Sequence, residues 1–178
     1  MEDFYQRHYF AYHKKTFHID PSSFLEPFIR YLKPGASILD VGCGSGRDLL
    51  WLKERGFRVM GFERSKGLAA LAGKHVNCEI IEGDFEIYDF SKLSIDAIIH
   101  VGALVHVPHD KMQAVFKHIT ACLKQSGKAL ITLKQGEGTQ TDEHDRVFYM
   151  WHDNDLRMIC HAWIQGSRFQ KAGFESKG

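Results

Sequence analysis

Three glycines at alternate positions, Gly42, Gly44 and Gly46, follow an apolar run that carries Asp40 near its end. Glycines spaced in this way let the backbone turn tightly and let a ligand approach without a Cβ in between. A dinucleotide site has the longer spacing G-x-G-x-x-G and places a pyrophosphate on a helix N-terminus. A carboxylate before the loop opposes a pyrophosphate and suits a cationic ligand. The loop therefore favours a ligand other than NAD.

Two later segments add residues that suit a nucleoside. Glu63 can accept hydrogen bonds from both ribose hydroxyls, and it would repel a 2′-phosphate. Asp84 can accept from an adenine amino group while Phe85 packs on the ring. The plainer alternatives are a surface carboxylate at Glu63 and a core position for Phe85. In series with the glycine loop, these residues predict a site for an adenosine-type nucleoside.

Strand-like and helix-like segments alternate around these residues. The expected strands span 37–41, 57–63, 78–84, 95–101 and 128–134. The expected helices between them span 47–56, 65–75 and 108–127. Apolar strands joined by helical crossovers predict an α/β fold, with a doubly wound, mainly parallel Rossmann-like sheet of about five strands and helices on both faces.

Two units are expected along the chain. Residues 1–34 form an N-terminal helical cap or lid, whose second helix starts at Asp20 and Pro21. Residues 35–178 form the ligand-binding domain, in which the polar segment 135–147 is expected to be a loop after the fifth strand.

Composition narrows the function classes. The chain has 178 residues, a formal net charge of +1 and no basic cluster, so no nucleic-acid partner is expected. The four cysteines, Cys43, Cys78, Cys122 and Cys160, form no zinc pattern, and no metal is expected. The sequence shows no signal peptide and no apolar run of about 18 residues. We therefore expect a cytoplasmic protein without a membrane partner.

The segments LDVGCGSGRD, GFERS, EGDFEIYDF and DAIIHVGALVHVP together resemble the class I S-adenosylmethionine-dependent methyltransferases, over residues 36–134. The resemblance implies S-adenosyl-L-methionine as cofactor and methyl transfer to a small-molecule substrate with an O, N, S or metalloid nucleophile. The patterns GSGRD, GEG and Arg146-x-Phe148 are similar to a small-molecule and tellurite-resistance-like subgroup.

The resemblance also implies which residues bind the cofactor. The glycines and Asp40 would surround its methionine part, Glu63 its ribose, and Asp84 with Phe85 its adenine. The full set implied is Asp40, Gly42, Cys43, Gly44, Gly46, Glu63, Arg64, Asp84, Phe85, Val101 and Tyr12. Cys43 is expected to fill space within the loop and not to act as a nucleophile.

Catalysis by this chemistry needs no metal or triad, because the methyl group is already activated. An O–H or N–H acceptor would benefit from a base tuned near neutral pH. His100 and His106 are candidates at the end of the fourth strand, and we prefer His106 as the catalytic residue. The alternatives are that His106 only shapes the pocket, or that it binds a metal with His109.

Two further groups are expected beside the site. Arg146 could bind an anionic substrate, and the alternative is a solvated loop residue. Tyr5, Tyr9 and Tyr12 could close over the cofactor as a lid, although their helical spacing suits core packing equally well.

The family normally adds a β-hairpin after the segment KAGF, and the sequence stops at Gly178. The expectation is that this hairpin is missing, through truncation or because a homodimer mate or other partner covers the edge of the fifth strand. Two alternative functions remain at this point. They are a non-catalytic S-adenosylmethionine-binding subunit and an NAD-dependent oxidoreductase.

Overall fold

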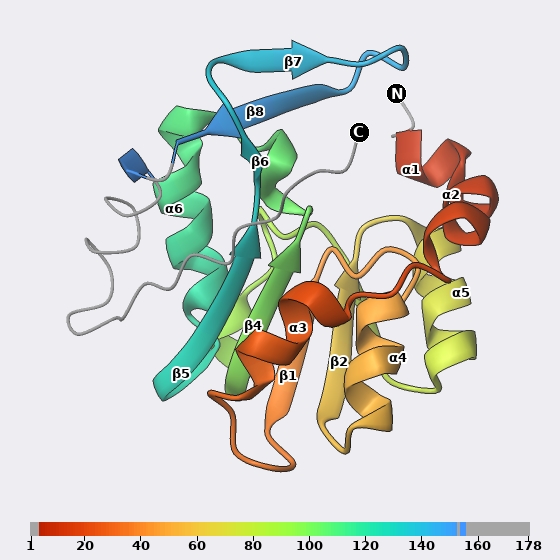
Figure 1. Cartoon of the computed structure of the whole chain (residues 1–178), viewed down its shortest axis with the longest axis vertical. Coiled ribbons are helices and arrows are strands. Elements are labelled where there is room, and N and C mark those ends of the chain that lie inside the picture. The colour runs from red at the N-terminus through yellow and green to blue at the C-terminus, as the bar shows by residue number, and fades with distance from the viewer. Residues whose placement is uncertain (1–3, 153, 156–178) are drawn as a thin grey trace.

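A five-stranded parallel sheet forms the centre of the computed structural model, which describes residues 4–152 and 154–155. The strand order is β3-β2-β1-β4-β5, so the direction of winding changes between β1 and β4 (Figure 1). The strands are β1 (Ser37–Val41), β2 (Arg58–Glu63), β3 (Ile80–Glu82), β4 (Ile95–Val101) and β5 (Leu123–Thr132). This confirms the predicted doubly wound sheet. Ligands bind such sheets at the carboxyl ends of the strands, beside the change in direction.

Helices cover both faces of this sheet. One face packs against α3 (Ser22–Ile29), α4 (Arg47–Glu54) and α5 (Lys66–Val76). The other face packs against α6 (His109–Thr120) and the short helix η1 (Phe90–Lys92). Because both faces of the sheet are buried, the central strands carry apolar residues at consecutive positions and not only at every second one.

The helix before β5 is shorter than predicted. The sequence predicts a helix that runs to Gly127, whereas α6 ends at Thr120 and β5 begins at Leu123. Leu123 pairs with Ile95 of β4, and the register shifts before Lys128 pairs with Ala97. Ser126 has a φ of 66°, a left-handed conformation that cannot continue a helix. Pairing with β4 therefore overrides the helical pattern.

The predicted polar loop 135–147 is instead part of a second sheet. Its strands are β6 (Lys134–Gln135), β7 (Thr139–Thr141) and β8 (Val147–Trp151), in the order β6-β8-β7. Strands β7 and β8 form an antiparallel hairpin. The side chains of β6 and β7 are exposed, so these strands lack the alternation of apolar residues that would mark them in the sequence.

The N-terminal segment is helical, as expected, but in three pieces. Helices α1 (Phe4–Arg7) and α2 (Tyr9–Thr16) precede α3, and both lie near the end of the molecule that carries β7 and β8 (Figure 1). Asp20 accepts a hydrogen bond from the backbone of Ser22, where α3 begins, one residue later than predicted. The KAGF segment lies outside the described residues, among which β5 is an edge strand of the main sheet.

Candidate cofactor and acceptor site

The glycine loop lies where the winding direction changes, directly after β1. Gly42 has a φ of 77°, and a Cβ at this position would lie 2.5 Å from the Cβ of Ala103. Gly44 has a φ of 54°, and a Cβ there would lie 3.4 Å from the ring of Tyr12. Both positions thus combine a left-handed backbone with close neighbours, which is why glycine is needed.

Glu63 fastens this loop to the start of α5. Its carboxylate accepts hydrogen bonds from the backbone N–H groups of Gly44 and Ser65, both at 2.8 Å. Only 7% of Glu63 is exposed. A carboxylate oxygen can accept more than one hydrogen bond, so this bracing is compatible with bonds to ribose hydroxyls. The structure therefore gives Glu63 a role in loop geometry that sequence analysis missed.

Asp40 is a buried acid at the end of β1. It is 1% exposed, and its Oδ2 has no hydrogen-bond partner among the described residues. Burial raises the pKa of Asp40 well above its ordinary value, and the nearby carboxyls of Asp48 and Glu63 raise it further, while Arg47 lowers it. The positive charge of a ligand with an ammonium or sulfonium group would stabilise the ionised, buried carboxylate of Asp40. The site thus fits a positively charged cofactor.

The predicted adenine-binding residues follow β3. Asp84 lies 3.9 Å from the guanidinium of Arg64 and accepts a hydrogen bond from the backbone of Glu86. Phe85 is partly buried against the core that β1 and α6 share. Val101 packs toward the opposite core, which contains α3 and α4. Phe85 and Val101 therefore contribute to the walls of the hydrophobic cores, and their contact with a cofactor stays a prediction.

Cys43 fills space within the glycine loop. It is buried and packs with Leu49, Ala72 and Val76 of the two neighbouring helices. Burial raises the pKa of its thiol well above the ordinary value, so the thiolate form is disfavoured. The thiol is therefore unsuited to act as a nucleophile.

Aromatic side chains from α1 and α2 cover the loop. The ring of Tyr12 lies against the Gly44 position, and the ring of Tyr5 packs edge-on against it at a centroid distance of 5.2 Å. Burial raises the pKa of Tyr12 to about 12, so its hydroxyl stays protonated. Tyr9 lies over Gly67 of α5, where any Cβ would lie 2.3 Å from its ring. The three tyrosines thus attach the N-terminal helices to the glycine loop and to α5.

Tyr5 also reaches His106, at the end of the short helix η2 (Leu104–His106). The Tyr5 hydroxyl lies 2.9 Å from Nε2 of His106, and Nδ1 of His106 lies 2.7 Å from the carbonyl oxygen of Val147. A carbonyl only accepts, so Nδ1 carries the proton. In neutral His106, Nε2 is then the acceptor and Tyr5 the donor. His106 is therefore oriented as a base toward the tyrosine.

Arg146 completes this cluster from the turn between β7 and β8. Its Nε and Nη2 donate to Oδ2 of Asp142 at 2.8 and 2.6 Å, and Nη1 lies 3.4 Å from the Tyr5 hydroxyl. The structure therefore brings together the predicted catalytic histidine, the predicted lid tyrosine and the predicted substrate arginine. Sequence analysis missed Asp142, whose signal was the four-residue spacing to Arg146.

His100 lies away from this cluster. It is 0% exposed in β4, its ring lies 6.5 Å from that of Phe116 in α6, and neither ring nitrogen has a partner among the described residues. His100 is therefore not in the position expected of a candidate base, because strand alternation turns it toward α6. His106 and His109 bond to different carbonyls, those of Val147 and Met150, which disfavours a shared metal.

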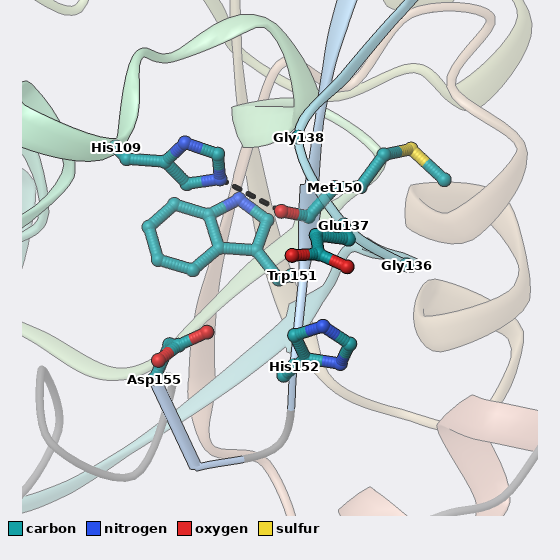
Figure 2. A pocket seen from close by; sticks show the side chains of 8 residues that line it. All are labelled: His109, Gly136, Glu137, Gly138, Met150, Trp151, His152 and Asp155. Atoms are coloured by element: carbon teal, nitrogen blue, oxygen red, sulfur yellow. Dashed lines mark hydrogen bonds between the residues drawn. The ribbon is translucent and has the colours of Figure 1, made fainter.

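A cavity of about 420 Å³ lies on another part of the surface, between α6 and the second sheet. Figure 2 shows the ring of His109 beside the indole of Trp151, with Nε2 of His109 bonded to the carbonyl oxygen of Met150. Glu137 and Asp155 are also in its lining, which includes none of the predicted site residues. The candidate site is instead covered by the tyrosines of α1 and α2.

The comparisons with known proteins all point to methyltransferases. A family model described as a methyltransferase domain matches residues 38–127. A sterol 24-C-methyltransferase from Yarrowia lipolytica is 26% identical over 191 residues, covering 96% of this chain and 46% of that protein. A phosphoethanolamine N-methyltransferase from Triticum aestivum is 31% identical over 149 residues, covering 80% of this chain and 28% of that protein.

A solved structure has the same fold. A TehB-like SAM-dependent methyltransferase from Corynebacterium glutamicum superposes with a TM-score of 0.68 at 20% identity, covering 88% of this chain and 82% of that one. This chain spans less than half the length of the two curated relatives. None of the helices in the described part is long and apolar enough to cross a membrane.

Proposed function

The chain belongs to the methyltransferase-domain family, and from this premise we propose that it transfers a methyl group from S-adenosyl-L-methionine to a small-molecule acceptor. The cofactor prediction agrees with the family match and with the buried, unpartnered Asp40 oxygen beside the glycine loop. The names of the two curated relatives give a sterol as the acceptor of one and phosphoethanolamine as the acceptor of the other. The tellurite-resistance-like subgroup stays a prediction, supported by the patterns GSGRD and GEG.

The observation that carries the catalytic part of this proposal is the hydrogen-bonded pair of Tyr5 and His106 above the glycine loop. The 2.9 Å bond joins a phenol to an imidazole whose tautomer is fixed by Val147. When bound, the cofactor supplies an activated methyl group on a sulfonium. The protein then has to orient the acceptor, exclude water and take up the acceptor's proton.

Tyr5 and His106 can perform this proton uptake together. A proton that leaves the acceptor passes to the Tyr5 oxygen as the Tyr5 proton passes to Nε2 of His106. The resulting imidazolium keeps its Nδ1–H bond to the carbonyl oxygen of Val147. Its positive charge replaces the sulfonium charge that the reaction removes, so the site undergoes no net change in charge. Tyr5 and Tyr12, whose rings pack edge to face, would help to exclude water from the methyl group when the cofactor is bound.

The test is a coupled assay for S-adenosylhomocysteine with the purified chain and a panel of sterol, amino-alcohol phosphate and quinol acceptors. With an active acceptor, His106→Ala should lower kcat by about 10²-fold or more, because the transition state loses its base. Tyr5→Phe should lower kcat similarly, since it removes only the hydroxyl. Calorimetry should show that both variants still bind S-adenosylmethionine.

Three results would contradict parts of this proposal. Unchanged turnover in His106→Ala would leave His106 as a wall of the pocket. Binding of S-adenosylmethionine with no product from any acceptor would favour a non-catalytic binding subunit. Binding of NAD in place of S-adenosylmethionine would favour the oxidoreductase alternative.

A further inference from the structure

We propose that Arg146 is a positioning residue that clamps helix α1 over the cofactor site, so that the β7–β8 hairpin controls how long the cofactor is retained. This inference rests on the proposed function, and it gives Arg146 a role different from direct substrate binding. It concerns three elements that are distant in sequence, namely α1, the start of α5 and the turn between β7 and β8.

The hairpin holds Arg146 in a fixed orientation. Asp142 accepts from Nε and Nη2 of Arg146, and it also accepts from the backbone N–H groups of His144 and Arg146, both at 3.0 Å. The backbone of Asp142 donates in turn to the carbonyl of Arg146 at 3.1 Å. These hydrogen bonds, led by the one from Arg146, lower the pKa of Asp142 to about 2, so the pair stays ionised near neutral pH. The guanidinium is therefore positioned before any ligand arrives.

The guanidinium presents its flat face and its remaining nitrogen to α1. Its Cζ lies 4.1 Å from the ring centroid of Phe4, within the range of a cation–π contact. Its Nη1 lies 3.4 Å from the Tyr5 hydroxyl. His144, in the same turn, stacks on Phe4 at a centroid distance of 4.9 Å. Two consecutive side chains of α1 are thus held by one turn of the hairpin.

The opposite side of α1 attaches to the cofactor-binding elements. The carbonyl of Tyr5 and the side chain of Gln6 accept hydrogen bonds from the hydroxyl of Ser65, at 3.3 and 3.0 Å. The backbone of Ser65 donates to Glu63, which braces the glycine loop. Helix α1 therefore bridges the hairpin and the region predicted to bind ribose.

Helix α1 depends on these contacts for its position. It has only four residues, none of them buried, and a helix of this length is not stable by itself. A lysine at position 146 could not reproduce the clamp, since an ammonium group cannot bind Asp142 through two nitrogens while stacking on Phe4. Loss of the guanidinium should therefore release α1 and speed cofactor exchange.

The experiment measures the rate at which bound, radiolabelled S-adenosylmethionine leaves the full chain when excess unlabelled S-adenosylhomocysteine is added. Arg146→Ala and Arg146→Lys should each speed release about tenfold, the factor that corresponds to losing contacts of this strength. Phe4→Ala should have a similar effect from the other side of the contact. The double variant should speed release by clearly less than the product of the two single effects, because both substitutions remove the shared Arg146–Phe4 contact.

Arg58→Ala is the matched control, because Arg58 is a guanidinium paired with Asp96 at the opposite, amino-terminal end of the strands. It should release cofactor at the wild-type rate. If Arg146→Ala fails to fold, Phe4→Ala and Tyr5→Phe still test the same contacts from α1.

Wild-type release rates in the Arg146 and Phe4 variants would overturn the clamp. In that case, loss of turnover in Arg146→Ala would restore the prediction of direct substrate binding. If His106→Ala retains full turnover while Arg146→Ala releases cofactor faster, the clamp stands and only the proposed proton transfer fails.

Discussion

At the scale of single residues, the candidate site is organised by buried acids. Asp40 and Glu63 lie at the carboxyl ends of the neighbouring parallel strands β1 and β2 and are almost fully buried. The charge of Arg47 lowers the pKa of Asp40, but burial and the neighbouring carboxyls of Asp48 and Glu63 raise it. Glu63 is satisfied by backbone N–H groups, whereas one oxygen of Asp40 has no partner among the described residues. Such an arrangement favours binding of a positively charged ligand and disfavours an anionic pyrophosphate.

The first prediction concerns Glu63. Glu63→Ala should weaken binding of S-adenosylmethionine about tenfold or more, because it removes charge-assisted bonds to the glycine loop as well as the expected bonds to ribose. Glu63→Gln should weaken it less, since the amide oxygen can still accept one of them. Isothermal titration of both variants checks this order, with Glu82→Ala, an exposed residue of β3, as the control. Equal affinities in all three proteins would remove Glu63 from the site.

At the scale of elements, strand β4 decides which of the two candidate histidines can contact Tyr5. Its register with β1 turns His100 into the core beneath α6, while the chain continues past Val101 into the helical turn that ends at His106. The sequence spacing between these histidines does not contain this information, because it depends on which face of the sheet α6 covers.

The buried His100 predicts a specific pH dependence of stability. Burial lowers its pKa from 6.5 to about 3 in the folded protein. Between these two pH values the unfolded chain binds more protons than the folded one, so the free energy of unfolding falls with falling pH, by at most about 1.4 kcal/mol per pH unit. His100→Leu should remove this contribution. Urea unfolding at pH 7.5 and 5 should show a smaller loss for the variant, and parallel losses would contradict the assignment.

At the scale of the whole molecule, the candidate site lies where three parts of the chain meet. The main sheet provides the glycine loop, the N-terminal helices provide Tyr5 and Tyr12, and the second sheet orients His106 through Val147. Ligand binding should therefore stabilise the molecule as a whole and not only the loop.

A prediction about ligand-induced stabilisation follows from this coupling. S-adenosylhomocysteine at 100 times its Kd should raise the free energy of unfolding by about 2.7 kcal/mol, which corresponds to a rise in Tm of roughly 5–10 °C for a chain of this size. NAD at the same concentration should leave Tm unchanged. Differential scanning calorimetry measures both shifts, and a larger shift with NAD would contradict the family-based cofactor assignment.

The sequence by itself determined the parallel sheet, the glycine loop and its accompanying acids. These features depend on local patterns, such as the apolar run before Gly42 and the helical pattern over 65–75, which the structure confirms as β1 and α5. The sequence did not determine where α6 ends, or that residues 134–151 form a second sheet. Both depend on pairing between strands, which satisfies backbone groups over long distances and leaves no periodic signal in exposed polar strands.

Only the tertiary structure decided how the polar side chains group together. It showed that Tyr5, His106 and Arg146, which lie up to 141 positions apart, are in contact, and that His100 is not among them. It also showed that Arg146 is already engaged by Asp142. The physical reason is that side-chain partners are chosen by packing of elements against one another. Residue type and spacing indicate which groups could react, and the packing determines which groups can meet.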